Sequence, residues 1–351
     1  MPPDALRSFL PAEPLTWTVT GCAGFIGSNL VEALLSAGHH VVGLDDFSTG
    51  YRHNLDDVIG RVGAEATARF TFIEGDIRDL DACRRACEGA DVVLHQAALG
   101  SVPRSIEDPL STHAVNVDGF VNMLVAARDA GVGRFVYASS SSVYGDHPGL
   151  PKVEAEVGTP LSPYAVSKRT DELYARTFQD HYGLEVIGLR YFNVFGRRQD
   201  PSGAYAAVIP KWIGQLLDGD RPMIFGDGET SRDFCYIANV VQANLRAGIA
   251  PSDATGTVYN IAYGDRTTLN GLYAAIVQNI EAERPDLTLP EAEYGPFRSG
   301  DIRHSLADIG QARARIGYAP THAAADGLRE AISWYLATYA SSPSPSASSV
   351  G

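Results

Sequence analysis

The chain has 351 residues, with 28 Lys or Arg against 42 Asp or Glu, and its formal net charge at pH 7 is −14. Because so acidic a protein repels a phosphate backbone, we do not expect it to bind nucleic acid. No run reaches the roughly 18 apolar residues of a membrane span, and the first residues lack the apolar stretch of a signal peptide, so we expect a cytoplasmic protein with no membrane partner.

Both ends of the chain are rich in proline or serine. Residues 1–16 contain four prolines, which prevent a long helix, so we expect an N-terminal arm before the fold begins. Residues 340–351 are rich in Ser and Pro and are predicted to form a disordered tail.

Short β-rich runs then alternate with helical patterns that end in glycine. The runs are apolar with few interruptions, as in strands of a parallel sheet covered by helices on both faces. Strands are predicted at 16–20, 40–45, 69–76, 90–98, 134–140 and 184–196. The pattern predicts an α/β fold, a doubly wound parallel sheet of the Rossmann type, over residues 17–192, with a later return near 235–262.

The alternation of predicted strands and helices ends after about residue 196. Longer loops rich in Gly, Pro and Arg follow, and an amphipathic helix is predicted near 325–338. We interpret residues 193–339 as mainly a smaller, mixed substrate domain. It is expected to cover the carboxyl edge of the sheet, where doubly wound folds bind their ligands.

A glycine-rich turn follows the first predicted strand. The spacing of Gly21, Gly24 and Gly27 permits a tight turn, close approach of a pyrophosphate, and close packing of the next helix. Asp45 ends the second strand, about 20 residues further on, where a carboxylate meets the adenosine ribose and repels a 2′-phosphate. This favours NAD over NADP. Asp76 ends the third strand similarly and either caps a loop or meets the adenine.

The four cysteines indicate packing rather than chemistry. Cys83 and Cys87 have the spacing of one helical turn, but no second pair completes a zinc site, so we expect no metal. The sequence shows no disulfide framework, which agrees with a reducing compartment.

Serine, tyrosine and lysine form the second motif. Tyr164 and Lys168 open a predicted helix, and their i,i+4 spacing places the phenol and the ammonium on one face. A free phenol has a pKa of about 10, but a nearby ammonium and a positive nicotinamide both favour the phenolate. Four serines at 139–142 follow the fifth strand, where a hydroxyl can hold a substrate oxygen. These motifs in this order predict an acid–base site that oxidises a hydroxyl.

These motifs resemble those of the extended short-chain dehydrogenase/reductase family, and within it the chain looks like the UDP-hexose 4-epimerases, most of all the bacterial UDP-N-acetylglucosamine 4-epimerases. The resemblance covers about residues 15–338. It is carried by TGCAGFIGSNL, LDDFSTG, the GD of EGDIRD, HQAALGSVPRS, NVDGF, SSSSVYGD, SPYAVSK, RYFNVFGRRQDP, GDGETSRDFCYI and RSGDIRHSLAD. It implies NAD-dependent C4 epimerisation of a UDP-hexose, by transient oxidation to a 4-keto sugar, rotation and re-reduction.

The resemblance also implies a role for each position that matches a family motif. The implied catalytic residues are Ser140, Tyr164 and Lys168. With Tyr164 and Lys168, the implied cofactor-binding residues are Gly21, Gly24, Phe25, Ile26, Gly27, Asp45, Asp46, Ser48, Gly50, Asp76, Ile77, Gln96, Ala97, Ala98, Asn116 and Tyr191. Asp46 departs from the family pattern, since most relatives carry Asn there. The implied substrate-binding residues are Gly100, Ser140, Ser141, Ser142, Asn193, Ala207, Val208, Arg232, Arg298, Asp301 and Ser305.

Small residues at two of these positions bear on the sugar. Gly100 stands where many UDP-galactose epimerases carry Lys, and Ser305 where enzymes restricted to non-acetylated sugars often carry Tyr. With Ala207 and Ser140 on the same wall, there would be room for an acetamido group, so the resemblance implies a preference for UDP-N-acetylglucosamine and UDP-N-acetylgalactosamine. Alternatively, Gly100 only serves a turn and Ser305 is an incidental loop residue.

Two other functions stay open. Related 4,6-dehydratases and decarboxylases use a carboxylate after the catalytic Ser or Thr, whereas Ser141 and Ser142 stand there in this chain. A catalytically silent NAD-sensing protein would keep the fold without the chemistry, but Tyr164 and Lys168 are both present. The family commonly pairs two helices from each subunit, so the resemblance further implies a homodimer through helices near 112–130 and 164–181.

Overall fold

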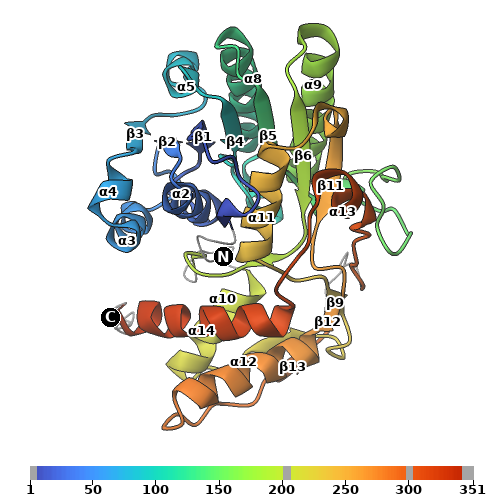
Figure 1. The fold of residues 1–351 in the computed structure, drawn as a ribbon. Coiled ribbons are helices and arrows are strands. Elements are labelled where there is room, and N and C mark those ends of the chain that lie inside the picture. The colour runs from blue at the N-terminus through green and yellow to red at the C-terminus, as the bar shows by residue number, and fades with distance from the viewer. Residues whose placement is uncertain (1–5, 201–206, 298–302, 342–351) are drawn as a thin grey trace, which may run out of the picture.

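The computed structural model describes residues 6–200, 207–297 and 303–341. Seven parallel strands form the main sheet in the order β11-β6-β5-β4-β1-β2-β3 (Figure 1). They are β1 (Thr16–Thr20), β2 (His40–Asp45), β3 (Phe70–Glu74), β4 (Val92–His95), β5 (Arg134–Ser140), β6 (Val186–Tyr191) and β11 (Thr257–Ile261). This confirms the predicted doubly wound α/β fold.

Helices cover both faces of this sheet (Figure 1). One face carries α2 (Phe25–Ala37), α3 (Arg52–Val62), α4 (Ala64–Thr67) and α11 (Ile237–Gly248), and the other carries α5 (Leu80–Cys87), α8 (Gly119–Asp129) and α9 (Pro163–Tyr182). All four cysteines are buried and unpaired, and Cys83 and Cys87 lie in the core between α5, α8 and the sheet. They are packing residues, as expected.

The strand order reverses at β1. From β1 the chain moves outward through β2 and β3, and then crosses back so that β4 pairs with the other side of β1. Such a reversal opens a crevice at the carboxyl ends of the two central strands. The glycine-rich turn follows β1 directly, so the fold places this turn in the crevice.

The predicted strand at 184–196 is interrupted. β6 ends at Tyr191, and the short strand β7 (Val194–Phe195) pairs instead with β10 (Cys235–Tyr236). Asn193 between them has a φ of 30°, a conformation that asparagine tolerates better than most residues. This turn directs the chain out of the main sheet. Of the expected return near 235–262, only β11 joins the main sheet, because α11 occupies most of the segment.

A second lobe lies beside the carboxyl edge of the sheet (Figure 1). Its helices are α10 (Val208–Asp218), α12 (Leu269–Glu283) and α14 (Ala324–Ser341), and its strand pairs are β8 (Met223–Phe225) with β13 (Glu293–Gly295) and β9 (Ser231–Arg232) with β12 (Thr267–Thr268). Short helices elsewhere are α6 (Val102–Glu107), α7 (Pro109–His113) and α13 (Gly310–Ile316). Because α14 runs to Ser341, it includes the first two residues of the predicted tail, while 342–351 lie outside the described residues.

The N-terminal arm is a correction to the sequence prediction, because its described part belongs to the core. Leu6 is 1% exposed and Leu10 is 7% exposed, and both pack in the same cluster as β1 and α2. The guanidinium of Arg246 on α11 lies 4.5 Å from the centre of the Phe9 ring. Prolines prevent a long helix in this segment, but its apolar side chains still gain free energy by leaving water.

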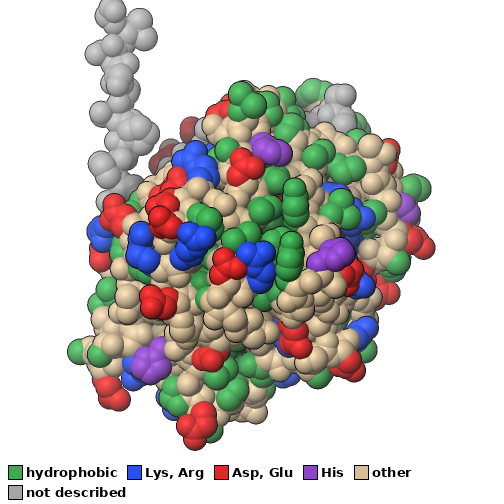
Figure 2. Space-filling view, turned by 90° about the horizontal axis from the view of Figure 1, so that it is seen from above, with side chains coloured by type: hydrophobic (Ala, Val, Ile, Leu, Met, Phe, Trp, Pro, Cys, Tyr) green, Lys and Arg blue, Asp and Glu red, His purple; other side chains and the backbone are tan. Residues whose placement is uncertain are grey.

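Within the described residues, no helix is long and apolar enough to cross a membrane. On the face shown in Figure 2, Lys and Arg side chains intermingle with Asp and Glu side chains, without a broad basic field.

Candidate active site

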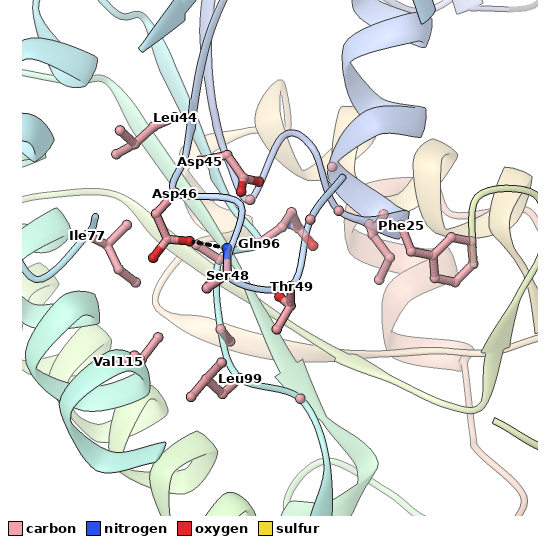
Figure 3. Close-up of a pocket in the computed structure, with 18 of the residues that line it drawn as sticks. Phe25, Leu44, Asp45, Asp46, Ser48, Thr49, Ile77, Gln96, Leu99 and Val115 are labelled. Atoms are coloured by element: carbon pink, nitrogen blue, oxygen red, sulfur yellow. Dashed lines mark hydrogen bonds between the residues drawn. The ribbon is translucent and has the colours of Figure 1, made fainter. Parts of the chain in front are cut away.

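A cavity of about 420 Å³ lies where the strand order reverses. Segments that follow β1, β2, β3 and β4 form its walls, and Figure 3 shows Asp45 and Asp46 on one side and Phe25 on the other. Fourteen of the residues expected to bind the cofactor line it: Gly21, Gly24, Phe25, Ile26, Gly27, Asp45, Asp46, Ser48, Gly50, Asp76, Ile77, Gln96, Ala97 and Ala98. Gly100, which was expected at the substrate, also lines this cavity.

The glycine-rich turn leaves no room for side chains. Gly21 has a φ of 66°, and a Cβ there would lie 2.9 Å from the backbone nitrogen of Ala97. A Cβ on Gly27 would lie 2.0 Å from the carbonyl oxygen of Gly21. Gly24 precedes α2, whose first turn carries no acidic residue and, within the described chain, no side-chain cap. The free N–H groups at this helix terminus suit a pyrophosphate.

Asp45 fixes the glycine-rich turn to the end of β2. Its Oδ2 accepts a hydrogen bond from the N–H of Ala23 at 2.8 Å, and its Oδ1 accepts one from the N–H of Phe47 at 2.8 Å. The carboxylate is 7% exposed, and burial raises its pKa. Each carboxylate oxygen keeps a second lone pair, so Asp45 can also accept a ribose hydroxyl.

The next two acids bind their own loops. Oδ1 of Asp46 accepts a hydrogen bond from the N–H of Ser48 at 2.9 Å (Figure 3). Asp76 accepts hydrogen bonds from the Arg78 backbone at 2.7 Å and from its Nε at 2.8 Å, and these lower the pKa of Asp76. Asp76 therefore caps a loop while lining the cavity, and its contact with an adenine stays a prediction.

Two expected cofactor residues support the cavity from behind its walls. Asn116, in the π-helical turn Ala114–Asp118, accepts a hydrogen bond from the N–H of Leu99 at 2.7 Å and donates one to Ser167 Oγ at 3.1 Å. The Tyr191 hydroxyl donates to Gln96 Oε1 at 3.0 Å and accepts from Asn244 Nδ2 at 2.8 Å. Both residues hold wall residues in place.

Helix α9 carries the tyrosine and the lysine. The helix begins at Pro163, and the hydroxyl of Ser162 accepts a hydrogen bond from the N–H of Ala165 at 3.1 Å. Such a cap and a proline at the first position stabilise a helix start. Lys168 lies one turn after Tyr164 and is 2% exposed, and its Nζ is 3.3 Å from Asp171 Oδ2. Asp171 is not among the residues that the sequence analysis singled out.

The four serines at 139–142 have different surroundings. Ser139 donates a hydrogen bond to buried Glu172 at 2.7 Å. Ser140, the next residue of β5, points to the other face of the sheet. Its Oγ accepts hydrogen bonds from the N–H of Ser142 at 3.1 Å and from the Ser142 hydroxyl at 3.0 Å. Ser141 and Ser142 belong to the 3₁₀ turn Ser141–Tyr144, which contacts α9.

A second cavity, of about 600 Å³, lies under the second lobe. Four expected substrate residues line it: Asn193, Ala207, Val208 and Arg232. Its other walls, which the sequence analysis missed, include Lys211, Trp212, Gln215, Met223, Phe225, Thr230, Phe234 and Leu269. Two short segments of the chain contribute to both cavities: Gly100 and Gln199 line the first cavity, and Pro103 and Asn193 line the second.

Arg298, Asp301 and Ser305 are the other residues expected at the substrate. Arg298 and Asp301 lie outside the described residues. Ser305 is half-buried and does not line either cavity, but its N–H donates to the carbonyl of Ser231 at 3.0 Å, next to Arg232.

The first cavity has further lining residues that the sequence analysis missed: Leu44, Thr49, Gly75, Leu99, Val115 and Gln199. Thr49 and Gly75 adjoin predicted site residues, so their positions could have been inferred. Gln199 could not, because its surroundings include segments distant in sequence, such as Tyr335, whose hydroxyl lies 3.3 Å from Gln199 Oε1. Its neighbour Arg198 is buried and pairs with Glu32 of α2 and, at 2.6 Å, with Asp57 of α3.

No group of three or more His, Cys, Asp or Glu side chains that could hold a metal ion occurs among residues 6–200, 207–297 and 303–341.

Comparisons with known proteins identify what this architecture resembles. Residues 17–262 match the model of the NAD dependent epimerase/dehydratase family. A UDP-glucose 4-epimerase of Mycolicibacterium smegmatis is 40% identical over 319 residues, which cover 90% of this chain and 97% of that protein. The UDP-N-acetylglucosamine 4-epimerase structure from Methanobrevibacter ruminantium, in complex with UDP-N-acetylmuramic acid, has a TM-score of 0.84 at 37% identity and covers 93% of this chain and 99% of that one. A dTDP-glucose 4,6-dehydratase structure from Streptomyces venezuelae, with NAD bound, has a TM-score of 0.79 at 30% identity, with 93% and 98% covered.

Proposed function

Because this chain belongs to the NAD-dependent epimerase/dehydratase family, we propose that it interconverts the C4 epimers of UDP-hexoses. The observation that carries the proposal is the position of the site. Tyr164 and Lys168 share one helix, and two separate cavities offer a dinucleotide cradle and an anchor with Asn193 and Arg232. In this proposal, residues 17–192 mainly hold the cofactor and 193–339 mainly hold the substrate.

The first cavity fits NAD. The glycine-rich turn, into which a Cβ would intrude, leaves the N–H groups of α2 for the pyrophosphate, and Asp45 meets the ribose. When bound, NAD accepts a hydride from C4 of the sugar and later returns it. Tyr164 takes the proton of the C4 hydroxyl and later returns it, Lys168 favours the phenolate, and Ser140 donates a hydrogen bond to the C4 oxygen.

The substrate must be held at one end and free at the other, because the 4-keto sugar has to present its other face before re-reduction. Asn193 and Arg232 are proposed to hold the diphosphate, together with Arg298. The apolar walls of the second cavity, such as Trp212 and Phe225, leave the nucleotide end immobile. This division of roles keeps the sugar in the site while it turns.

A dehydratase is the second candidate, since a dTDP-glucose 4,6-dehydratase has the same fold. Elimination of water from C5 and C6 requires an additional acid or base beside the tyrosine. Ser141 and Ser142, in the 3₁₀ turn next to α9, provide no carboxylate there. This favours the epimerase.

The purified protein, without added cofactor, should interconvert UDP-glucose with UDP-galactose or their N-acetylated counterparts. The measurement is chromatography of the products from each of the four UDP-hexoses. If none of the four is converted although NAD is bound, the epimerase proposal is wrong, and release of a 4-keto-6-deoxy sugar instead would identify a dehydratase.

We propose further that the N-acetylated sugars are preferred. The φ of Gly100 lies outside the left-handed region, and a Cβ there would meet no described atom within 4 Å. The turn does not need glycine, so the open space at Gly100 supports a role in making room for the substrate. Ala207, an exposed small residue before α10, lines the second cavity and leaves room there as well.

Ser305→Tyr should therefore suppress turnover of UDP-N-acetylglucosamine and UDP-N-acetylgalactosamine while sparing UDP-glucose and UDP-galactose. The phenol would fill space that only the acetamido group needs. The measurement is the ratio of kcat/KM for the two substrate classes, with Ser305→Ala as the control that removes the hydroxyl without adding bulk. Unchanged kcat/KM values for both classes would remove Ser305 from the sugar wall, and an equal loss on both classes would indicate general damage.

The homodimer also stays a proposal. On α9, within the expected interface at 164–181, Val166, Leu173 and Tyr174 are 51%, 56% and 42% exposed and follow the i, i+7, i+8 spacing of one helix face. An exposed apolar face of this kind favours association. Sedimentation should give the mass of a dimer, and Leu173→Asp should shift it towards the monomer. A monomer at all concentrations would contradict the pairing of 164–181 with 112–130.

A further inference from the structure

A buried carboxylate lies beside the lysine of the proposed catalytic pair. Asp171 follows Lys168 by three residues on α9, and Nζ of Lys168 is 3.3 Å from its Oδ2. The side chains of Lys168 and Asp171 are 3% and 0% exposed. Oδ1 of Asp171 has no hydrogen-bond partner within the described part of the chain. An ion pair that excludes water this completely is rare unless it has a role.

The charges around Asp171 leave Lys168 as its partner. Glu172, the next residue, is itself held by Arg190 of β6 at 2.8 Å and by Arg169 at 2.7 Å, so its charge is already balanced. The two arginines pair with Glu172 and not with Asp171 in any described contact.

The remaining neighbours add little positive charge. Tyr137 of β5 is buried, and the charge of Asp171 contributes to raising its pKa, which keeps the phenol neutral. Burial, and then the charge of Lys168, lower the pKa of His95 on β4 to about 3, so its imidazole is neutral. His113 of α7 and Asp118 of the π-helical turn are about two-thirds exposed, at 64% and 65%. Water screens charges that are exposed to this degree.

An epimerase uses one tyrosine in both directions, as the base for oxidation and as the acid for re-reduction. A lysine that stabilised the phenolate too strongly would slow the return of the proton, because acid–base catalysis is most efficient when proton affinities are matched. A negative charge 3.3 Å from the ammonium weakens its field at Tyr164. Burial raises the pKa of Asp171, and the charge of Lys168 opposes this rise, as expected for an ion pair between the two side chains.

We propose that Asp171 is a positioning residue for the Tyr164–Lys168 pair, which holds the ammonium in place and partly neutralises it so that Tyr164 both accepts and returns the proton. This inference rests on the proposed function only where it takes Tyr164 to be the acid and base of the reaction. The effect of Asp171 on the ionisation of Tyr164 can be measured without turnover.

The test is Asp171→Asn, which preserves shape and removes the charge. With the charge removed, Lys168 favours the phenolate more strongly. The acid limb of the kcat/KM profile should therefore move to lower pH by about one unit. This is the order of magnitude expected when a unit charge acts across several ångströms at an effective dielectric constant of about 20. Ultraviolet difference absorbance against Tyr164→Phe should show tyrosinate formation moving in the same direction. The matched control is Asp180→Asn, which removes an exposed carboxylate of the same helix and should leave both profiles unchanged.

If Asp171→Asn does not fold, Asp171→Ser offers a second variant in which a water can replace the carboxylate. A loss of activity that is equal at every pH, with an unmoved tyrosinate titration, would overturn the proposal and assign Asp171 a purely structural role. If no UDP-hexose is converted by the unmodified protein but the tyrosinate titration moves as expected, the proposed function fails while the role of Asp171 stands.

Discussion

Tyr164→Phe is expected to lower turnover of every UDP-hexose substrate by at least the roughly 10²-fold typical of a lost general acid or base. The substitution keeps the ring and removes only the hydroxyl that takes and returns the C4 proton. Tyr164 lines neither cavity, whereas Asn193 and Arg232 line the second one, so binding of UDP should survive. Initial rates and a titration with UDP measure the two effects separately.

The matched control for this substitution is Tyr182→Phe. Tyr182 ends the same helix and is 54% exposed, so loss of its hydroxyl should leave turnover unchanged. If Tyr164→Phe keeps nearly full activity, another group carries the proton and the proposed mechanism is wrong. If UDP binding disappears as well, the substitution has damaged the site as a whole.

Gly27→Ala should release the cofactor. A Cβ at Gly27 would lie 2.0 Å from the oxygen and 2.7 Å from the carbonyl carbon of Gly21, and both atoms belong to the backbone of the turn itself. Since the turn has to shift, the expected cost is that of overpacking, about 1–3 kcal/mol. If this cost falls on the cofactor complex, the affinity for NAD is about 5- to 150-fold weaker.

The unmodified protein, purified without added nucleotide, should release NAD(H) on denaturation, and Gly27→Ala should release much less. Gly60→Ala is the matched control, because Gly60 lies in α3 and a Cβ there would meet no described atom within 4 Å. Alanine favours a helix over glycine by about 1 kcal/mol, so this variant should keep its cofactor. Release of NADP(H) alone by the unmodified protein would contradict the argument from Asp45.

The sequence by itself determined the parts of this protein that depend on local pattern. Apolar runs separated by helical periodicity predicted the parallel sheet, because a strand buried on both faces needs apolar side chains on both. The glycine-rich turn could be predicted because its three glycines stand within one short segment, where the close approach of Gly27 to Gly21 is local. The i,i+4 spacing placed Tyr164 and Lys168 on one helix face for the same local reason.

Only the tertiary structure decided which distant segments meet. Asn193 turns the chain out of the sheet. Gln199 lines the cofactor cavity, and its neighbour Arg198 pairs with helices more than a hundred residues earlier in the chain. Leu6 and Leu10 turn a proline-rich arm into part of the core. Asp171 has an ordinary place in an amphipathic helix, and its burial follows from how α9 packs on the sheet. Burial, ion pairs and cavity walls arise from contacts between residues far apart in the sequence, and local propensity does not encode such contacts.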